Sequence, residues 1–251
     1  MENSKKKKNL ITAVIMTALI LTALVLFFTL PLSKVSSNGF VFTKMENGTY
    51  RVKSYTGNAS YVEVPETVRG IKVTEIAPRA FQNQNRIKTL VVRSSVEKIG
   101  GAAFIGCTSI ESLTVPFIGG SNDHNPHLDY VFSGNTGLNL NATLVPRSLK
   151  KVYVTKGCTK ISTSAFYMCE NLTEVHIPST VTRIEDGSNY ISVGVNGNTP
   201  SSNDYYRPFY GCSMNLKIYC ASSKKPEEWG EHWNDTVTSG KALVFWSSKE
   251  Y

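Results

Sequence analysis

The sequence predicts a β-rich solenoid, a parallel sheet with short helical turns, preceded by one transmembrane helix. The first observation is an internal repeat, because residues 158–178 (CTKISTSAFYMCENLTEVHIP) align without a gap with residues 96–116 (VEKIGGAAFIGCTSIESLTVP). The two copies share their apolar positions and differ in their polar ones, which is typical of a repeated structural unit. The second observation is a pair of apolar residues, separated by one residue, that recurs along the chain. The third is an apolar run over residues 10–30.

The recurring apolar pair predicts the main strand of each coil. Side chains alternate in direction along a strand, so the two apolar residues point into the coil and the residue between them points outward. The basic spacing between successive pairs is 23 residues. A proline follows several of these strands and ends the ladder, because proline has no amide donor. The pairs are Val62/Val64, Leu90/Val92, Leu113/Val115, Val152/Val154, Val175/Ile177 and Ile218/Cys220.

A second apolar pair and a phenylalanine recur between the main strands. The second pairs are Val73/Ile76, Val96/Ile99, Cys158/Ile161 and Val181/Ile184. The phenylalanines are Phe81, Phe104 and Phe166, each preceded by alanine, with Phe209 displaced in the last coil and Phe132 expected in the stretched one. An alanine before each phenylalanine is as expected of a short helical turn. One coil cannot bury its apolar sides alone, so several stacked coils are required.

The rest of the chain divides around the repeat array, which is expected to cover residues 38–220. Residues 38–60 are expected to form an entry cap, a hairpin with its turn at Asn47-Gly48, that shields the first coil. Two insertions, over residues 117–144 and 185–207, interrupt the repeat, and the polar second one is expected to be a surface loop. Residues 221–251 carry all 3 tryptophans and are expected to form a C-terminal cap and tail.

The amino-terminal segment predicts a membrane anchor. Four lysines precede the apolar run over residues 10–30, whose helix would span roughly 30 Å, the thickness of a bilayer core. The lysines place residues 1–9 in the cytoplasm, so residues 10–30 are expected to be an uncleaved signal-anchor helix, followed by a linker over residues 31–37. The chain would then be a single-pass membrane protein with its repeat domain extracellular. A cleaved signal peptide is the alternative, although its apolar region should be shorter.

Charge and cysteine content limit the partners. The net charge is +8, and residues 1–33 supply +3 of it through four lysines and Glu2, so the remainder carries +5. This part has no long basic run, which gives nucleic acid binding little support. The chain has 5 cysteines, an odd number for an exported protein. Cys107, Cys169 and Cys212 share one repeat position, where buried free thiols and a Cys169–Cys212 disulfide between adjacent coils are both open.

With these positions in place, the chain resembles the BspA-like leucine-rich-repeat family of surface proteins over about residues 38–235. Its repeat is similar to the family pattern IPxxVtxIgxxAFxxCxxLxxVxI. Further similar segments are GTYRVKSYTG at residues 48–57, PFIGGS and DYVFSG in the first insertion, and LKIYCASSKKPEEW at residues 216–229. The resemblance implies a leucine-rich-repeat solenoid. Family members are often exported surface proteins, several of them implicated in adhesion to host matrix or to other cells.

The outward row of the main sheet is the candidate ligand-binding face. Repeat proteins bind on the extended surface that their strands line, and exposed tyrosines often anchor interfaces. The predicted row is Glu63, Val91, Thr114, Tyr153, His176 and Lys217, flanked by Thr89, Ser112, Lys151, Glu174 and Tyr219. The residues expected to bind ligand are Val91, Thr114, Lys151, Tyr153, Glu174, His176, Lys217 and Tyr219. The alternative is a solvated sheet whose outward residues bind nothing.

The first insertion contains a weak candidate for a metal site. Asp123, His124, His127 and Asp129 offer two imidazoles and two carboxylates, which could bind a divalent metal. The neighbouring Asn and Pro residues make the same composition ordinary for turns, so no metal or other cofactor is expected. None of the 4 histidines lies in a motif with nucleophile spacing, and no Walker loop or Cys-x-x-Cys pair occurs. No catalytic residue is therefore expected.

The sequence thus favours a membrane-anchored, cell-surface leucine-rich-repeat protein that binds ligands and is not an enzyme. The expected partners are an extracellular protein or glycan and the membrane, through residues 10–30, and not nucleic acid. The resemblance implies adhesion or another interaction with a host or a neighbouring cell. Two alternatives stay open: a structural envelope subunit whose sheet docks another membrane protein, and a surface hydrolase that uses the loop with His124 and His127.

Overall fold

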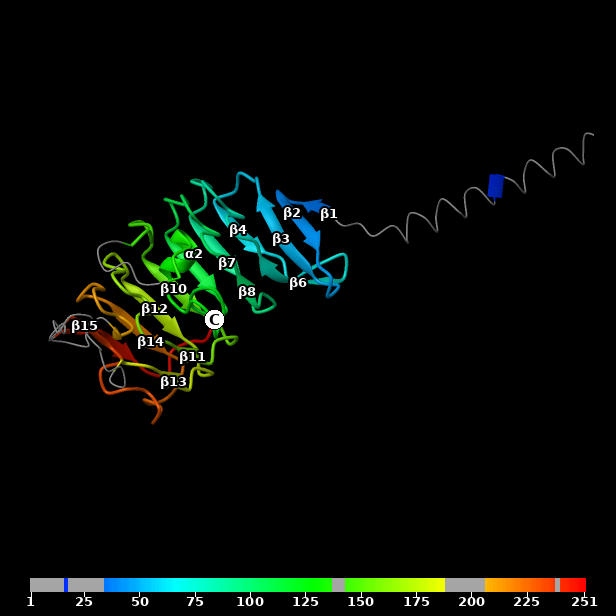
Figure 1. Cartoon of the computed structure of the whole chain (residues 1–251). Helices are drawn as coiled ribbons and strands as arrows, with labels where there is room; N and C mark the ends of the chain where they lie inside the picture. Colours follow the sequence, from blue (N-terminus) through cyan, green and yellow to red (C-terminus); the bar gives the residue numbers. More distant parts are fainter. Residues whose placement is uncertain (1–15, 18–33, 137–142, 188–205, 238–239) are drawn as a thin grey trace, which may run out of the picture. The chain divides into compact units, whose positions relative to one another are not determined.

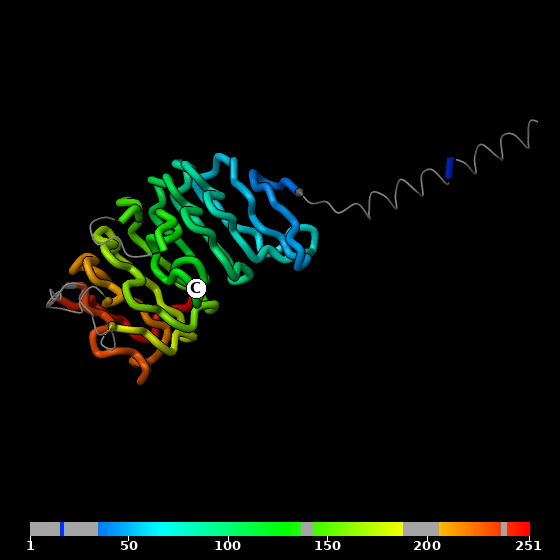
Figure 2. Tube along the Cα trace, in the orientation of Figure 1, coloured from blue at the N-terminus to red at the C-terminus, as the bar shows by residue number. Residues whose placement is uncertain are grey.

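The computed structural model describes residues 16–17, 34–136, 143–187, 206–237 and 240–251. Contacts divide the chain into two units, Met1–Val35 and Ser36–Tyr251, and the repeats lie in the second. Within this second unit the strands of successive coils lie side by side (Figure 1), and the traced backbone winds through one coil after another (Figure 2). The repeat therefore builds the solenoid that it predicts.

A 7-stranded parallel sheet is formed by one strand from each coil. Its strands are β4 (Tyr61–Val64), β7 (Thr89–Val92), β9 (Ser112–Val115), β10 (Lys151–Val154), β12 (Glu174–Ile177), β14 (Lys217–Cys220) and β17 (Leu243–Phe245). The order in the sheet follows the order in the chain, because each coil adds its strand beside the previous one. The register places Val64 beside Val92 and Val115 beside Val154. All the predicted inward pairs are buried, which confirms them.

A second set of strands pairs on another side of the coils. They are β6 (Ile71–Ile76), β8 (Lys98–Ile99), β11 (Lys160–Ile161) and β13 (Arg183–Ile184). β6 pairs in parallel with β8, and β11 pairs in parallel with β13. The second apolar pairs lie in or directly before these strands, and all of their residues are buried. The four coils with a second pair therefore bury two apolar pairs each.

The phenylalanines form buried stacks, as their shared repeat position predicts. The ring of Phe104 lies 5.6 Å from that of Phe81 and 5.8 Å from that of Phe132. Phe166 and Phe209 stack at 4.9 Å, although the insertion separates them in the sequence. Phe132 lies on helix α2 (Asp129–Ser133), so the first insertion supplies the phenylalanine of its own coil. These five rings are each less than 2 % exposed.

The entry cap closes the first end of the phenylalanine stack. The cap carries β2 (Phe40–Lys44) and β3 (Tyr50–Tyr55), and the flanking β1 (Lys34–Ser37) and β5 (Thr67–Val68) belong to the same sheet. β2 and β3 form the expected antiparallel hairpin, and β3 pairs in parallel with β6. The rings of Phe40 and Tyr55 lie 6.1 Å and 5.4 Å from that of Phe81. The hairpin therefore extends the second side of the coils and not the main sheet.

The other end of the array carries a strand that the sequence analysis assigned to the cap. β17 pairs in parallel with β14, after an antiparallel pair formed by β15 (Asp235–Val237) and β16 (Gly240–Lys241). The tryptophans cluster here, with the ring of Trp229 lying 4.6 Å from Trp233 and 5.7 Å from Trp246. The Trp229 Nε1 donates to the Val181 carbonyl at 3.2 Å, which ties the cap to the preceding coil. Of the second insertion, residues 188–205 lie outside the described residues.

The expected transmembrane helix is not supported, and this part of the predicted fold is corrected. Of residues 10–30, the structure describes Met16 and Thr17, and the others lie outside the described residues. Crossing a bilayer requires roughly 20 consecutive apolar residues in one helix. Within the described ranges, no helix reaches the length and apolarity that a membrane crossing needs. The single-pass localisation, which depended on that helix, is therefore unsupported as well.

All five cysteines are buried free thiols, so Cys169 and Cys212 form no disulfide. The Cys212 Sγ donates to the Phe166 carbonyl at 3.2 Å, and the Cys107 Sγ donates to the Phe81 carbonyl at 2.9 Å. In both cases the acceptor belongs to the phenylalanine turn of the preceding coil. Burial raises the pKa of Cys107 to about 11. The thiols at this position are therefore protonated and unreactive, and those of Cys107 and Cys212 join adjacent coils.

Candidate ligand-binding face

The outward residues of the main sheet lie in one row across its strands. The row, in strand order, is Glu63, Val91, Thr114, Tyr153, His176, Tyr219 and Phe245. The predicted places of Lys217 and Tyr219 are exchanged, because Tyr219 pairs with His176 whereas Lys217 pairs with Glu174. Tyr219 lies between the inward Ile218 and Cys220, and alternation along the strand directs it outward. Phe245, on the strand that the sequence analysis did not predict, extends the row.

Four successive residues of this row, Tyr153, His176, Tyr219 and Phe245, form an aromatic ladder. The rings of Tyr153 and His176 stack at 4.4 Å with 20° between their planes. His176 and Tyr219 stack at 4.6 Å and 10°, and Tyr219 and Phe245 at 4.9 Å and 17°. These distances match the spacing of about 4.8 Å between neighbouring strands, so equivalent side chains on parallel strands stack directly. The parallel register therefore builds the ladder.

His176 lies in the middle of the ladder and is nearly covered. Its exposed fraction is 9 %, and neither ring nitrogen has a hydrogen-bond partner among the described residues. The Oε2 of Glu174 lies 3.7 Å from the His176 Nε2, beyond hydrogen-bond reach. Burial lowers the pKa of His176, and the nearby Glu174 carboxylate opposes this only partly. The imidazole is therefore neutral at neutral pH and acts as an aromatic ring.

A charged row flanks the ladder. Lys151, Glu174 and Lys217 lie side by side in the register of β10, β12 and β14. The Lys151 Nζ lies 3.1 Å from the Glu174 Oε2, and this contact raises the pKa of Lys151. Lys217 is exposed, and Glu174 is half-buried between the two lysines. The predicted charged site residues are therefore brought together beside the rings.

A segment after β17, residues 246–251, turns back over the ladder, and we call it the return segment. The Ser247 amide donates to the Ser222 carbonyl and the Ser248 amide to the Cys220 carbonyl, both at 2.9 Å. The ring of Tyr251 lies 4.6 Å from Tyr153 and 4.9 Å from His176. In Figure 2 the red end of the chain accordingly meets the green middle of the array. The sequence analysis did not predict this contact.

Glu250 fixes the return segment beside the ladder. Its Oε2 lies 2.7 Å from the Lys156 Nζ, and its Oε1 accepts hydrogen bonds from the Ser179 amide, at 2.9 Å, and from the Ser179 hydroxyl. Lys156 and Ser179 follow β10 and β12, the two strands that carry Tyr153 and His176. The ammonium group of Lys156 and the two Ser179 donors hold the pKa of Glu250 at about 2.

The amino-terminal half of the outward row has no ring. Glu63 accepts from the Arg93 Nε at 2.7 Å and from the Tyr61 hydroxyl at 2.9 Å. Val91 is buried and Thr114 is half-buried. Val91 and Thr114 therefore share the row with the other predicted site residues, but they lie outside the aromatic ladder.

The metal candidates of the first insertion do not assemble. Asp129 accepts hydrogen bonds from the Ser133 hydroxyl at 2.6 Å and from the Leu144 amide at 2.6 Å, so its carboxylate holds the insertion together. His127 is buried, and burial lowers its pKa. Within the described ranges, no group of three acidic, histidine or cysteine side chains is placed to hold a metal, including Asp123 and His124.

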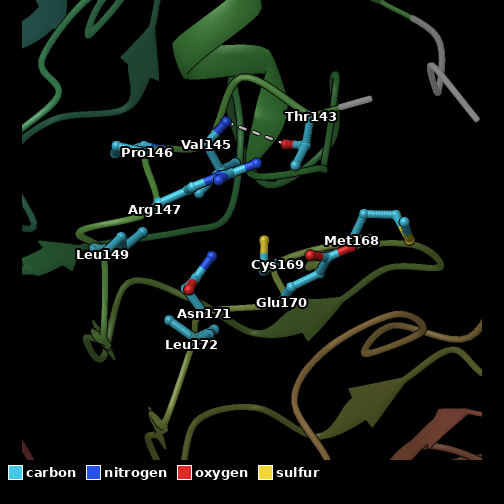
Figure 3. Close-up of a pocket in the computed structure, with 10 residues that line it drawn as sticks. All are labelled: Thr143, Val145, Pro146, Arg147, Leu149, Met168, Cys169, Glu170, Asn171 and Leu172. Atoms are coloured by element: carbon cyan, nitrogen blue, oxygen red, sulfur yellow. Dashed lines mark hydrogen bonds between the residues drawn. The ribbon is translucent and has the colours of Figure 1, made fainter. Parts of the chain in front are cut away.

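A cavity of about 230 Å³ lies between the segment that precedes β10 and the turn after Phe166 (Figure 3). Its walls are formed by residues 143–149 and 168–172, none of which belongs to the outward row. The Val145 amide donates to the Thr143 hydroxyl at 3.1 Å in this wall. Burial raises the pKa of the lining Cys169 well above its usual value, so this thiol is no nucleophile. Residues 137–142, next to the cavity in the chain, lie outside the described residues, and no site is assigned to it.

Several solved structures are similar to this chain. The leucine rich repeat protein of T. pallidum is 16% identical with a TM-score of 0.42, and the match covers 85% of this chain and 86% of that one. A leucine-rich repeat protein of Bacteroides capillosus is 22% identical with a TM-score of 0.35, covering 61% and 87%. A leucine rich cell surface protein of Faecalibacterium prausnitzii is 18% identical with a TM-score of 0.37, covering 86% and 55%. No curated protein matches the sequence.

The repeat itself matches a family model. The model of the BspA type leucine rich repeat region matches residues 51–192 and 141–223, with 6 copies of the repeat. The matched residues make up more than half of the chain, and they contain the coils that form the main sheet from β7 to β14. The chain therefore belongs to the BspA type leucine rich repeat family.

Proposed function

We propose that this chain is a protein-binding repeat module whose ligand contacts the aromatic ladder and the charged row beside it. The observation that carries the proposal is the ladder itself, four stacked rings on the outward face of the sheet. Repeat proteins bind on such strand-lined faces, and tyrosines are enriched where interfaces are anchored. Arrays of BspA type repeats are generally binding or structural and not catalytic.

The stacking favours a protein ligand over a glycan. Each inner ring of the ladder is covered on its faces by its neighbours, at 4.4 Å to 4.9 Å. A sugar stacks on an open ring face, whereas this ladder offers ring edges and the hydroxyls of Tyr153 and Tyr219. The edge of an aromatic ring is electropositive and attracts the face of another ring or an anionic group. Aromatic and acidic side chains of a protein partner supply both.

The test is a parallel screen of the full chain against a displayed random peptide library and a glycan array. We expect peptides to bind, and the double substitution Tyr219→Ala/Phe245→Ala to weaken their binding at least about tenfold, because anchor residues contribute about 2 kcal/mol or more. Thr114→Ala is the matched control, since it lies in the same row outside the ladder and should leave binding unchanged. Binding to glycans that depends on the ladder, without binding to peptides, would show that the ligand class is wrong.

One observation favours a permanent structural partner instead. β17 is the last strand of the main sheet, and its Leu243 and Phe245 are 57 % and 42 % exposed. An exposed apolar edge strand is usually covered, because its free backbone groups can pair with another chain. A permanent partner would co-purify with the chain and resist high salt, whereas a transient ligand would not.

A further inference from the structure

We propose that the ligand of this face is a protein segment in which an acidic residue directly precedes an aromatic residue, and that the return segment occupies the same place in the free chain. The inference rests on the function proposed above, since it specifies the partner of the same ladder. The return segment itself carries such a pair, Glu250 and Tyr251, and both side chains are seated on the sheet.

The aromatic part of the site is formed by two ladder rings, Tyr153 and His176. Tyr251 meets Tyr153 with 57° between the ring planes and meets His176 with 77°, close to an edge-to-face arrangement. This is the geometry that the electropositive edge of one ring and the face of another prefer. His176 is neutral and stacked between Tyr153 and Tyr219, so its orientation is set before any ligand arrives. A partner's aromatic side chain can make the same contacts.

The acidic part of the site is formed entirely by donors. The Lys156 ammonium, the Ser179 amide and the Ser179 hydroxyl all bind the Glu250 carboxylate. A charged carboxylate suits this set better than a neutral amide or hydroxyl, because charge-assisted hydrogen bonds are the stronger ones. The low pKa of Glu250, about 2, agrees with this preference. Glu250 fills the acidic part and the adjacent Tyr251 fills the aromatic part. The site therefore selects an acidic residue directly followed by an aromatic one.

The return segment is attached weakly enough to be displaced. Beyond Ser248, the hydrogen bonds found among the described residues all use the Glu250 carboxylate. Tyr251 is 52 % exposed, and the Lys156 side chain is 65 % exposed. A partner segment can therefore replace Lys249 to Tyr251 without breaking the sheet. Because the return segment is tethered, its effective concentration at the site is on the order of millimolar, and a partner segment must compete with it.

The direct test measures binding of a labelled peptide with the sequence of residues 246–251, WSSKEY, to the full chain and to its Glu250→Gln/Tyr251→Ala variant. We expect the peptide to bind the variant at least about tenfold more tightly than the wild-type chain, because the tethered competitor is gone. Adding Tyr153→Ala or Lys156→Gln to the variant should abolish this gain. Equal unfolding midpoints of the variant and the wild type would show that the fold is intact.

The controls distinguish binding at this site from non-specific binding of the peptide. A peptide with Gln-Ala in place of Glu-Tyr should not bind the variant. Tyr61→Ala should not affect binding, because Tyr61 is an exposed tyrosine on β4, at the opposite edge of the sheet. Equal binding of WSSKEY to wild type and variant, or equal binding of both peptides, would overturn the inference. So would a wild-type dimer that Tyr251→Ala converts to a monomer, because the occupant would then come from a second copy of the chain.

A library selection on the Glu250→Gln/Tyr251→Ala variant distinguishes this inference from the proposed function. We expect the selected peptides to carry an acidic residue directly before an aromatic one, and to lose binding with Lys156→Gln. Peptides that depend on Tyr219 and Phe245 but lack this pair would overturn the inference and leave the proposed function standing. Selected peptides whose binding depends on none of the four ladder rings would contradict the proposed function itself.

Discussion

In the amino-terminal half of the main sheet the outward row carries Glu63, Val91 and Thr114, whereas the carboxyl-terminal half carries the four rings of the aromatic ladder. From β4 to β14 the inward residues of both halves are buried apolar pairs. Packing between coils therefore constrains the inner face of every strand and leaves the outer face free. The four rings lie on one half of the sheet, where packing between coils does not require them, and this half is the binding surface that we propose.

The largest expected effect tests whether the two halves share one core. Phe104→Ala and Phe166→Ala should each lower the free energy of unfolding by about 3–5 kcal/mol, because each removes a fully buried ring and leaves a cavity between coils. Phe104 packs in the amino-terminal half and Phe166 in the carboxyl-terminal half, and both are 0% exposed. Urea unfolding followed by circular dichroism measures both. If only one of the two variants loses less than about 1 kcal/mol of its free energy of unfolding, the two halves are not packed alike and the prediction is wrong.

The next largest effect compares how much outward residues of the two halves contribute to stability. Tyr219→Ala should lower the free energy of unfolding by about 1–3 kcal/mol, since it removes the stacked pairs with His176 and Phe245, each worth about 0.5–1.5 kcal/mol. Thr114→Ala, in the same row of the other half, should change it by no more than about 0.5 kcal/mol. The same urea measurement compares the two variants. Equal losses would mean that the ladder adds nothing beyond an ordinary outward position.

Much of the fold could be predicted because it depends on local alternation. Inward pairs such as Val152/Val154 follow from the two-residue period of a strand. Phe132 could be assigned to the phenylalanine position of its coil because the other coils carry a phenylalanine at that position. β17 was missed because Leu243 to Phe245 lacks the second apolar pair and the phenylalanine that identify a coil. Lys217 was placed in the row by a two-residue slip, which keeps the side chain on the outward face but moves it to the neighbouring row.

The parts that could not be predicted depend on contacts between distant residues. Ser179 and Glu250 lie 71 residues apart, and no local pattern indicates that they meet. The tyrosines and histidine of the ladder were predicted as site residues, but their stacking follows from a register that only the folded chain defines. The weak metal candidates do not gather among the described residues; Asp129 accepts hydrogen bonds within the insertion, which composition alone cannot show.

A smaller effect is the pH dependence that His176 adds to the carboxyl-terminal half. Burial lowers its pKa in the folded chain, so around its usual value of about 6.5 the unfolded chain binds more protons. The free energy of unfolding should therefore fall as the pH is lowered from about 7 to about 5, and less so in His176→Phe. His127 is also lowered by burial and has the same sign, so part of the slope should persist. Urea unfolding at both pH values measures it, and identical slopes in the two proteins would contradict the prediction.

The smallest effect concerns the contact that closes the return segment over the ladder. Glu250→Gln should speed hydrogen exchange of the Ser179 amide by about 1.5- to 5-fold, because an exposed ion pair contributes little and its loss frees this amide more often. The Ala221 amide, which donates to the Ile177 carbonyl at 2.9 Å, is the control and should not change. In the wild type, the pKa of Glu250 is about 2, so this protection should be present above about pH 4.5 and be lost as the pH falls through about 2. If Ser179 exchanges equally in both proteins, Glu250 does not hold the segment, and the ladder is open in the free chain.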